Sequence, residues 1–448
     1  MADQSLRVVL AALERDGELR RVAEPVSPRF ELSAMLSAGD GGPALLFESV
    51  QGSRMPIVGN VLGTRARIAA SLGVAVDELG ERIVTALASP IEPVPAGDAP
   101  CQEVVVDDPD LASLPLPWFF EHETGPYVTA GAIVARDSDT RAANLSIARI
   151  KPLGGERAMA GIAPNHHLAV LGRRAAARGE TLPIAVTIGN HPAVLVASCL
   201  YLDFGEDELA RAGPLLGEPV RAARTQTGLA VPADCEIVLE GRLDYRETVY
   251  EGLVSEFHGM YEDYGEGPVV TFDRMTTRRD PILQVVQPGR HREHLLLGGV
   301  AIAAGLTAEL RRIVPAVTEV AVPEGGAGRL TAVVALEPGA RPGSAQRAMF
   351  AAWASVSLIR TVTVVDADVD PWDHEQVEWA RTAHARPDRD LVVVGGGQAD
   401  RADPLERDRR VAKLGIDATR KAADRADQRE AAPPADVVAA VRRRLAGS

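Results

Sequence analysis

A chain of 448 residues is too long to fold around one hydrophobic core, so we expect two or three domains. Its hydrophobic fraction of 46% and charged fraction of 25% are those of a soluble globular protein. The formal net charge of −14 argues against a nucleic acid as partner, because a phosphate backbone repels an acidic protein.

The three cysteines, Cys101, Cys199 and Cys235, are widely spaced and form no CxxC pair. This pattern excludes a disulfide scaffold and a thiolate zinc site, and it is typical of a protein in the reducing cytosol. The first residues lack the apolar core of a signal peptide, and no run of about 18 apolar residues occurs. We therefore expect a cytoplasmic protein with no membrane partner.

The first hundred residues mix helical and strand patterns. Apolar residues recur at helical spacing in 6–22, 30–38 and 64–87. A short strand is predicted at Ala44–Phe47, and the four prolines within 89–101 indicate a stiff linker. These patterns predict an N-terminal α/β lobe over residues 1–101.

Residues 102–300 consist mainly of short β-rich runs separated by turn residues, with helices predicted at 166–178 and 206–212. Such a pattern is typical of a barrel or a sandwich, so we predict a central β-barrel-like domain over 102–300. The runs are Glu103–Val106, Val128–Ala135, Leu145–Ile150, Ile184–Ile188, Glu236–Gly241, Val269–Arg274 and Ile282–Val286.

After residue 300, helices and strands alternate again, which predicts a C-terminal α/β lobe over 301–405. The elements are helix 299–313, strand 317–322, strand 329–336, helix 343–355 and strand 360–365. The charged, alanine-rich tail, 406–448, is predicted to form helices at 406–424 and 435–446 that lie against another subunit. Gly395–Gly397 lacks the lysine of a phosphate-binding loop and is predicted to form a turn.

Two carboxylates stand close together in the segment Tyr250–Tyr261. Glu251 and Glu256 are five residues apart, so they do not share a helical face, and two glycines in the segment disfavour a helix. A loop with two acids suits acid/base chemistry, because burial can separate the pKa values of the two groups. A solvated surface turn is the alternative interpretation of this segment alone.

Arg149 ends a predicted strand that begins at Asn144. With a period of two, it lies on the same face as Leu145 and Ile147. An arginine that faces inward needs a carboxylate partner, because a buried unpaired charge is very costly, and Glu251 is our candidate. The alternative is an arginine at the strand edge that reaches water.

Possible metal ligands with oxygen and nitrogen donors occur at the starts of the two predicted helices of the central region. Asn165, His166 and His167 precede or open the first helix, and Glu208 begins the second. An amide oxygen, one imidazole and a carboxylate suit Mn²⁺ or Mg²⁺, with phosphate oxygens completing the shell. A capping or core histidine is the alternative.

Several segments occur in the order and at the spacing that they have in a known protein family. They are Gly125–Tyr127, Asn144–Arg149, Leu182–Gly189, Glu208–Gly213, Val231–Gly241, the loop with Glu251 and Glu256, Val364–Asp370 and Val377–Ala380. Together they resemble the UbiD family of prenylated-flavin-dependent decarboxylases over nearly the whole chain. The resemblance implies an α/β multidomain fold, in which a central split β-barrel-like flavin domain lies between two α/β lobes with a helical tail.

The resemblance also implies roles for individual residues. Arg149, Glu251 and Glu256 match the catalytic triad, in which Glu256 protonates the carbon that has lost CO₂. Metal ligands for Mn²⁺ (or Mg²⁺) fall on Asn144, His167 and Glu208, and oxygens around Ala197, Ser198, Leu200 and Glu208 would bind K⁺. Contacts to prenylated FMN fall on Ile147, Ala148, Arg149, Gly161, Ile162, Ala163 and His166, with Arg360 where relatives carry a phosphate-contacting lysine.

The resemblance implies the substrate class and the partners less directly. Phe257, His258, His294 and Leu297 are expected to line the pocket, which favours a furan or pyrrole carboxylate, with phenolic or arylacrylic acids as the alternative. A flavin prenyltransferase would supply the cofactor, CO₂ would be released reversibly, and a homodimer or higher even oligomer is expected. A flavin-binding oxidoreductase and a non-catalytic subunit of a carboxylase complex are alternatives of another class.

One departure from the family pattern concerns the loop between the two acids. Many relatives carry Gly-Pro-Phe/Tyr-Gly there, and this chain has Gly252-Leu253-Val254-Ser255. The loss of a proline and a glycine leaves the shape of the loop open.

Overall fold

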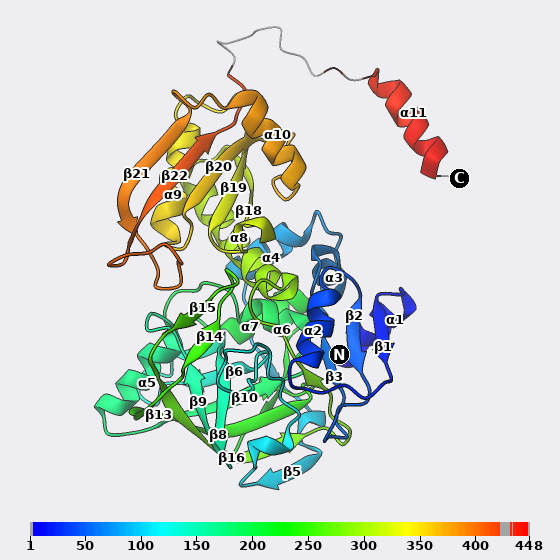
Figure 1. Ribbon diagram of the computed structural model, residues 1–448, viewed down its shortest axis with the longest axis vertical. Coiled ribbons are helices and arrows are strands. Elements are labelled where there is room, and N and C mark those ends of the chain that lie inside the picture. Colours follow the sequence, from blue (N-terminus) through cyan, green and yellow to red (C-terminus); the bar gives the residue numbers. More distant parts are fainter. Residues whose placement is uncertain (1–2, 422–430, 432, 447–448) are drawn as a thin grey trace.

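The computed structural model describes residues 3–421, 431 and 433–446, which form three lobes along the chain (Figure 1). The first lobe has a four-stranded sheet in the order β1-β2-β3-β17. Its last strand, β17, comes from the far end of the central region and pairs in parallel with β3. The strands are β1 (Leu19–Val22), β2 (Ala44–Phe47), β3 (Ile57–Gly59) and β17 (Leu283–Gln284), and the helices are α1 (Leu6–Arg15), α2 (Glu31–Ala38), α3 (Arg65–Ser71) and α4 (Leu79–Ala88).

Two helix predictions in this lobe need correction. The helix predicted over 6–22 ends at Arg15, and its last four residues form β1, which pairs in parallel with β2. Gly17 makes the break, because its φ of 74° lies in the left-handed region that ends helices. The pattern in 64–87 is likewise divided into α3 and α4, with Gly73 at a φ of 69° between them.

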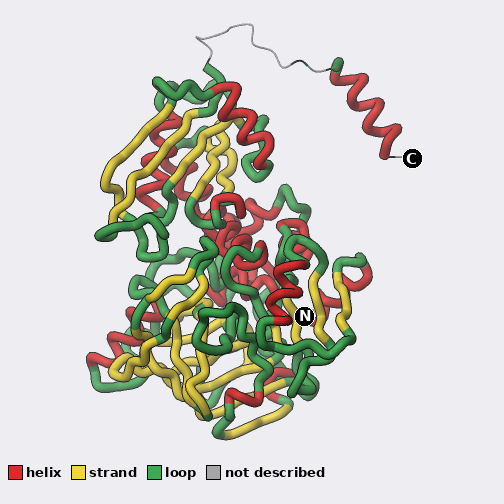
Figure 2. Tube along the Cα trace, in the orientation of Figure 1, coloured by secondary structure: helices red, strands yellow, loops and turns green. Residues whose placement is uncertain are grey.

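The central lobe is built on a sheet with the strand order β7-β6-β10-β13-β16-β9-β8, with β5 paired to β16 (Figure 2). Each predicted β-rich run overlaps a strand, although the run Leu145–Ile150 divides into two strands at Ala148. No ladder joins β7 to β8 among the described residues, so the hydrogen bonding of the sheet does not close into a barrel. The strands are β5 (Val104–Asp107), β6 (Ala132–Arg136), β7 (Ala143–Ile147), β8 (Arg149–Gly154), β9 (Arg157–Gly161), β10 (Leu182–Ile188), β13 (Ile237–Tyr250) and β16 (Glu266–Thr277).

Helices and two smaller sheets complete this lobe. A three-stranded sheet in the order β12-β11-β4 includes two residues of the predicted linker, and a hairpin of β14 and β15 follows β13. The helices are α5 (His167–Ala177), α6 (Pro192–Ala197) and α7 (Glu208–Leu216), and the strands are β4 (Val94–Pro95), β11 (Arg221–Arg224), β12 (Ala230–Pro232), β14 (Leu253–Ser255) and β15 (Tyr261–Asp263).

The C-terminal lobe is a five-stranded sheet in the order β18-β19-β20-β22-β21. Its elements are α8 (Arg292–Ile313), β18 (Val317–Ala321), β19 (Thr331–Leu336), α9 (Ser344–Ser355), β20 (Thr361–Asp366), α10 (His374–His384), β21 (Leu391–Gln398) and β22 (Arg410–Asp417). One more helix, α11 (Ala435–Ala446), agrees with the prediction and lies apart from the lobes in Figure 1.

The helix predicted over 406–424 is wrong, as is the turn predicted at Gly395–Gly397. Residues 410–417 form β22, which pairs with β20 and β21 inside the C-terminal sheet, and the predicted turn lies within β21. The pairing with β20 buries Gly415 to Asp417, so tertiary contacts override the local helical preference of the charged segment. The part of the prediction after Lys421 lies outside the described residues.

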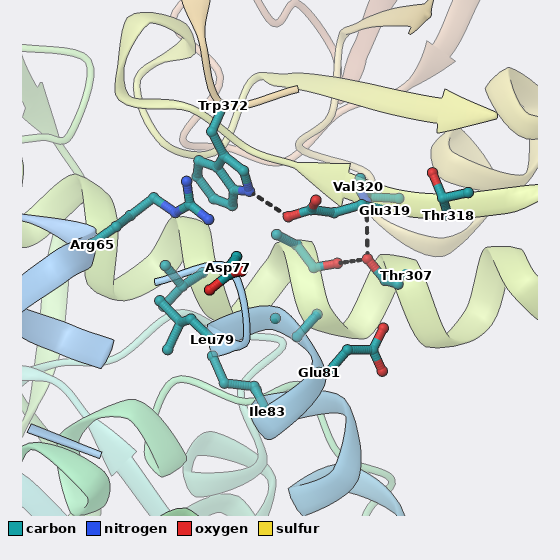
Figure 3. Close-up of a pocket in the computed structure, with 14 residues that line it drawn as sticks. Arg65, Asp77, Leu79, Glu81, Ile83, Thr307, Thr318, Glu319, Val320 and Trp372 are labelled. Carbon is teal, nitrogen blue, oxygen red and sulfur yellow. Dashed lines mark hydrogen bonds between the residues drawn. The ribbon is translucent and has the colours of Figure 1, made fainter. Parts of the chain in front are cut away.

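Contacts between the first and C-terminal lobes surround a cavity of about 60 Å³ where α4, α8 and β18 meet (Figure 3). The Arg65 guanidinium lies 4.2 Å from the ring centroid of Trp372, whose Nε1 donates a 2.8 Å hydrogen bond to Glu319. This volume holds only a few water molecules, so the cavity is a packing feature between lobes and does not admit an organic substrate.

The long helix α8 connects all three lobes. By length and composition it is the one described helix that could cross a membrane, but 78% of its most apolar window is buried inside the protein. Near its start, the buried Glu293 accepts hydrogen bonds of 2.8 Å from the backbone N–H groups of Asn60 and Leu62, just after β3. Burial raises the pKa of Glu293 to about 7, against the effect of these hydrogen bonds.

We predict that Glu293→Ala destabilises the protein by about 2–4 kcal/mol, because two buried N–H groups lose their acceptor. Thermal unfolding should show a clear decrease in Tm. Glu309→Ala on the same helix is the control, since Glu309 is partly exposed and pairs with Arg312 at the surface, where such pairs contribute little. Equal Tm values for the two variants would contradict this role of Glu293.

Candidate active site

An ion pair between Arg149 and Glu251 forms the centre of the candidate site. Nε and Nη2 of Arg149 each donate a 2.6 Å hydrogen bond to one carboxylate oxygen of the buried Glu251. Gly161 pairs with Arg149 across β8 and β9, and a Cβ atom at Gly161 would lie 2.6 Å from Nε of Arg149. The predicted pair is therefore present, and a glycine makes room for it.

The pair keeps Arg149 charged although the guanidinium is desolvated. Burial lowers the pKa of Arg149, but the hydrogen bonds and the charge of Glu251 outweigh burial and raise this pKa above its ordinary value. Thr124 and Lys151 hold the other end of Glu251, because both donate hydrogen bonds to its backbone carbonyl, at 2.6 and 2.7 Å. The carboxylate is thus fixed by its side chain and by its backbone.

Glu256 directly follows the first strand of the β14–β15 hairpin, so the segment expected to be a loop is a short hairpin. The turn closes with hydrogen bonds from Glu256 N to Met260 O and from Gly259 N to Glu256 O. Within residues 3–421, no cationic side chain forms a salt bridge with the half-buried Glu256, although its charge helps to raise the pKa of Arg149. Its carboxyl group is therefore close enough to act on the charge of Arg149 and accepts a 3.1 Å hydrogen bond from the backbone N–H of Phe257.

A third acid, Glu123, holds the hairpin in place. The hydroxyl of Ser255 donates a 2.7 Å hydrogen bond to Glu123, and the backbone N–H of Phe120 donates to its other oxygen at 3.2 Å. Burial raises the pKa of Glu123, and the hydrogen bonds from Ser255 oppose that rise. The side chain of Ser255 therefore ties the hairpin to Glu123.

Two buried tyrosines add hydroxyl groups beside the acids. Burial, together with the negative charge of Glu251 or Glu256, raises the pKa of Tyr127 and of Tyr264 well above the ordinary value. Tyr127 interacts with Glu251 and Tyr264 with Glu256, and each interaction adds to the rise. Both tyrosines therefore keep their protons at neutral pH.

Two of the three predicted metal ligands lie together. Nδ2 of Asn144 is 3.1 Å from one oxygen of the buried Glu208, and the backbone N–H of Leu145 donates to the other oxygen at 2.7 Å. Burial raises the pKa of Glu208 to about 7, and no salt bridge to it occurs in the described part of the chain. A buried carboxylate without a cationic partner fits a metal ion.

No hydrogen bond or salt bridge joins the third predicted ligand, His167, to these two side chains in the described part of the chain. Its ring packs edge-on against Phe204 with 5.3 Å between centroids, and α5, which it begins, packs on the same strand as α7. Among the described residues, no three His, Cys, Asp or Glu side chains form a cluster that could hold a metal ion. A site made from Asn144, His167 and Glu208 therefore stays a prediction.

The remaining predicted cofactor residues come from several elements of the central and C-terminal lobes. Ala197 ends α6, where Ser198 bonds back to Leu195 and the N–H of Leu200 donates to the carbonyl of Ala197. Ile147 and Ala148 lie at the junction of β7 and β8, Ile162 and Ala163 follow β9, and His166 precedes α5. Arg360 pairs with the buried Asp403 at 2.9 Å, so it is already neutralised by a carboxylate.

The predicted pocket residues have different surroundings. Phe257 is buried below the guanidinium of Arg329, while His258 faces Glu262 at 3.4 Å within the hairpin. Leu297 is part of the main hydrophobic core. Burial lowers the pKa of His294 to about 3, and its Nδ1 lies 3.1 Å from the carbonyl of Gly289, so this histidine is neutral.

A cavity of about 340 Å³ borders the hairpin on the side of the first lobe. Its lining includes Phe120, Ser255, Tyr261, Gly289 and Arg290. This volume suits a small organic molecule, and the cavity reaches Ser255, which directly precedes Glu256.

Sequence reasoning missed Glu123, Tyr264, Arg329 and Arg401 in this region. Arg401 lies 4.3 Å from the ring centroid of Tyr264 and comes from the segment between β21 and β22. Tyr264 was the most accessible to prediction, because a hairpin centred on His258 places it opposite Gly252. The others come from distant segments and carry no local signal.

Three domain families match consecutive parts of the chain. They are the N-terminal domain (residues 10–87), the Rift-related domain (92–291) and the C-terminal domain (295–418) of 3-octaprenyl-4-hydroxybenzoate carboxy-lyase. Together they cover nearly all of the three lobes described above.

Similar proteins share the whole length of the chain. The anhydromevalonate phosphate decarboxylase of Methanosarcina mazei is 32% identical over 421 residues, which are 92% of this chain and 96% of that protein. The structure of the UbiD-class enzyme HmfF from Pelotomaculum thermopropionicum in complex with FMN has a TM-score of 0.91 and 37% identity, and covers 97% of this chain and 98% of its own. The apo 3,4-dihydroxybenzoic acid decarboxylase from Enterobacter cloacae has a TM-score of 0.89 and 26% identity, with coverage of 97% and 98%.

The three lobes, the buried acid–arginine site and these relatives define the chain as a carboxy-lyase, an enzyme that acts on carboxylic acids as a decarboxylase. Within that class, the chain belongs to the UbiD family.

We predict that Glu123→Ala lowers kcat by about 10–100-fold. Without the hydrogen bonds to Glu123, the hairpin that carries Glu256 is no longer held in place, and the Glu256 carboxyl group shifts away from the reacting carbon. Flavin content should change little, whereas Tm should decrease, because the donors of Ser255 and Phe120 lose their buried acceptor. Steady-state kinetics on the cofactor-loaded enzyme measure the effect, with Glu121→Ala as the matched control, since Glu121 is exposed two residues earlier.

The tether itself is tested by Ser255→Ala and by the double variant. If the two side chains act through one hydrogen bond, the double variant loses no more activity than Glu123→Ala alone. Additive losses, or full activity in Ser255→Ala, would contradict this explanation.

Proposed function

We propose that this enzyme catalyses the reversible, non-oxidative decarboxylation of an unsaturated or heteroaromatic carboxylic acid with prenylated FMN. The observation that carries the proposal is the bidentate pair of Arg149 and the buried Glu251, with the carboxyl group of Glu256 close enough to act on the same guanidinium. Similar structures that contain FMN or prFMN support the choice of cofactor.

Loss of CO₂ leaves a carbanion, which is the difficult species in this reaction. When bound, prenylated FMN supplies an acceptor for those electrons. The protein must orient the acid, exclude water and deliver a proton. Arg149 directs its remaining N–H groups to the substrate carboxylate while Glu251 fixes its plane, and Glu256 donates the proton to the carbon that CO₂ leaves.

We propose that Asn144, His167 and Glu208 hold Mn²⁺ (or Mg²⁺) against the cofactor phosphate, with K⁺ at the oxygens around Ala197, Ser198 and Leu200. The buried, unneutralised carboxylate of Glu208 supports this assignment. The metal would supply positive charge for the phosphate, and His167 would complete the set of ligands after a change of its side-chain orientation.

The substrate that we propose is a small heteroaromatic acid, a furan or a pyrrole carboxylate. Neutral His294 donates from Nδ1 to the carbonyl of Gly289, which leaves Nε2 as an acceptor for a polar ring substituent or a pyrrole N–H. Phenolic or arylacrylic acids are the alternative. The relatives named for anhydromevalonate phosphate and for 3,4-dihydroxybenzoic acid are decarboxylases of different acids.

The remaining proposals concern architecture and setting. The open central sheet would act as a split barrel around the flavin, with domain limits near residues 101, 300 and 405. An even oligomer, with α11 against a second subunit, is supported by the exposed apolar residues Val437, Val441 and Leu445 on that helix and by a similar dimeric form of HmfF. We place the enzyme in the cytosol, where a flavin prenyltransferase would supply its cofactor.

We predict that Glu256→Gln lowers turnover by at least about 100-fold, because glutamine has the same shape and cannot donate the required proton. The absorbance of the bound cofactor should be unchanged. The measurement is CO₂ release from a panel of carboxylic acids after co-expression with a flavin prenyltransferase. Wild-type turnover in this variant with cofactor bound would refute the proton-donor role.

Arg149→Ala should leave the fold intact and remove both activity and cofactor maturation. The carboxylate of Glu251 then loses its partner, and the substrate carboxylate loses its donor. Far-UV circular dichroism reports the fold, and flavin absorbance reports maturation. Arg157→Ala is the control, because Arg157 lies on the adjacent strand and pairs with Glu247 at the surface. Normal maturation together with normal activity in Arg149→Ala would contradict the assignment.

A further inference from the structure

Tyr264 directly follows β15, the second strand of the hairpin. The strand register places it opposite Gly252, and at the next residue the carbonyl of Gly265 accepts a 2.9 Å hydrogen bond from the backbone N–H of Glu251. These backbone contacts fix the point from which the Tyr264 side chain extends, next to the acid that pairs with Arg149.

Two guanidinium groups from different lobes lie over the ring of Tyr264. Cζ of Arg149, on β8, is 5.4 Å from the ring centroid. Cζ of Arg401, in the segment between β21 and β22 of the C-terminal lobe, is 4.3 Å from it. Arg149 is bound to Glu251, whereas no salt bridge to Arg401 occurs in the described part of the chain. A cation is attracted to the face of an aromatic ring, so the two arginines restrict the orientation of this ring.

The hydroxyl of Tyr264 interacts with the carboxyl group of Glu256. Burial is the main cause of the raised pKa of Tyr264, the negative charge of Glu256 adds to the rise, and the positive charge of Arg149 opposes it. The phenol therefore keeps its proton and can donate it in a hydrogen bond to Glu256. The backbone N–H of Phe257 is a second donor to this carboxyl group, at 3.1 Å.

Two donors of this kind matter for an acid that gives up its proton. When the proton moves from Glu256 to carbon, the acid becomes a carboxylate, and hydrogen bonds to that carboxylate stabilise the product of the transfer. Donors fixed by the backbone and by a stacked ring also limit rotation of the carboxyl group, so that its proton is held toward one position.

We infer that Tyr264, with its ring held by Arg401, is a positioning residue for Glu256. Its hydroxyl orients the carboxyl group and stabilises the carboxylate that remains after the proton has moved to the carbon that CO₂ leaves. The inference rests on the proposed function for the role of Glu256 as proton donor. The C-terminal lobe then contributes to proton delivery through Arg401.

The first test compares Tyr264→Phe with wild type, both loaded by co-expression with a flavin prenyltransferase. Phenylalanine keeps the ring and its stacking and removes only the hydroxyl. For the acid that wild type decarboxylates fastest, kcat should fall about 10–100-fold, which is the effect of one hydrogen bond to a charged group. KM and flavin content should stay within about twofold, and the ratio of kcat in H₂O to kcat in D₂O should increase, because proton transfer then limits the rate more strongly.

Tyr250→Phe is the matched control in the same hairpin region. Tyr250 is exposed at the end of β13, and its hydroxyl donates a 2.6 Å hydrogen bond to the exposed Asp263. This variant should keep the wild-type kcat and solvent isotope effect.

Arg401→Gln tests the part assigned to the C-terminal lobe. Loss of the cation over the ring should lower kcat by about 2–5-fold. In the Tyr264→Phe background the same change should have no further effect, because Arg401 acts through the hydroxyl. A further loss in the double variant would mean that Arg401 acts on the substrate directly, and would overturn this part of the inference.

A measurement without turnover separates this inference from the proposed function. In protein labelled with ¹³C at the glutamate carboxyl carbon, the NMR signal of Glu256 is the one that is missing from Glu256→Gln. Its chemical shift should move in Tyr264→Phe and stay in place in Tyr250→Phe. An unmoved signal, or wild-type kcat in Tyr264→Phe, would overturn the inference. A moved signal in an enzyme that decarboxylates none of the acids would uphold the contact and refute the proposed function.

Discussion

The structure depends on keeping one guanidinium charged in a place that water hardly reaches. Arg149 meets this condition only because Glu251 accepts two of its hydrogen bonds and is itself held by Thr124 and Lys151. A buried ion pair stabilises little by itself, since desolvation offsets the attraction, but breaking it is very unfavourable. The strand pairing, the glycine opposite Arg149 and the anchored hairpin therefore serve mainly to fix a geometry.

The ion pair could be predicted from the sequence because the argument needs only the residues on either side of Arg149 in its strand. A strand period placed Arg149 among apolar neighbours, and the energetic penalty of an unpaired charge then required an acid. The strands of the central sheet were found for a similar reason, since β-rich runs and turn residues are properties of short segments. The roles of Glu256, Asn144 and His167 came from family resemblance, and their function stays a proposal.

The errors share a physical cause, which is pairing between distant segments. β1 and β22 are short or charged segments that have helical patterns, and each becomes a strand by pairing with strands elsewhere in the chain. The tether from Ser255 to Glu123 spans 132 residues, and the contact of Arg329 with Phe257 joins two lobes. Apolar periodicity contains no information on such contacts, so only the folded chain reveals them.

The two-residue strand β17 has a consequence for the order in which the protein is made. The first lobe completes its sheet with residues that follow the central lobe, so it cannot finish folding when its own residues leave the ribosome and must wait for residue 284. More than half of the polypeptide must be synthesised before that edge of β3 is covered. Until then the nascent lobe exposes an unpaired strand edge, which is a site at which chains can aggregate.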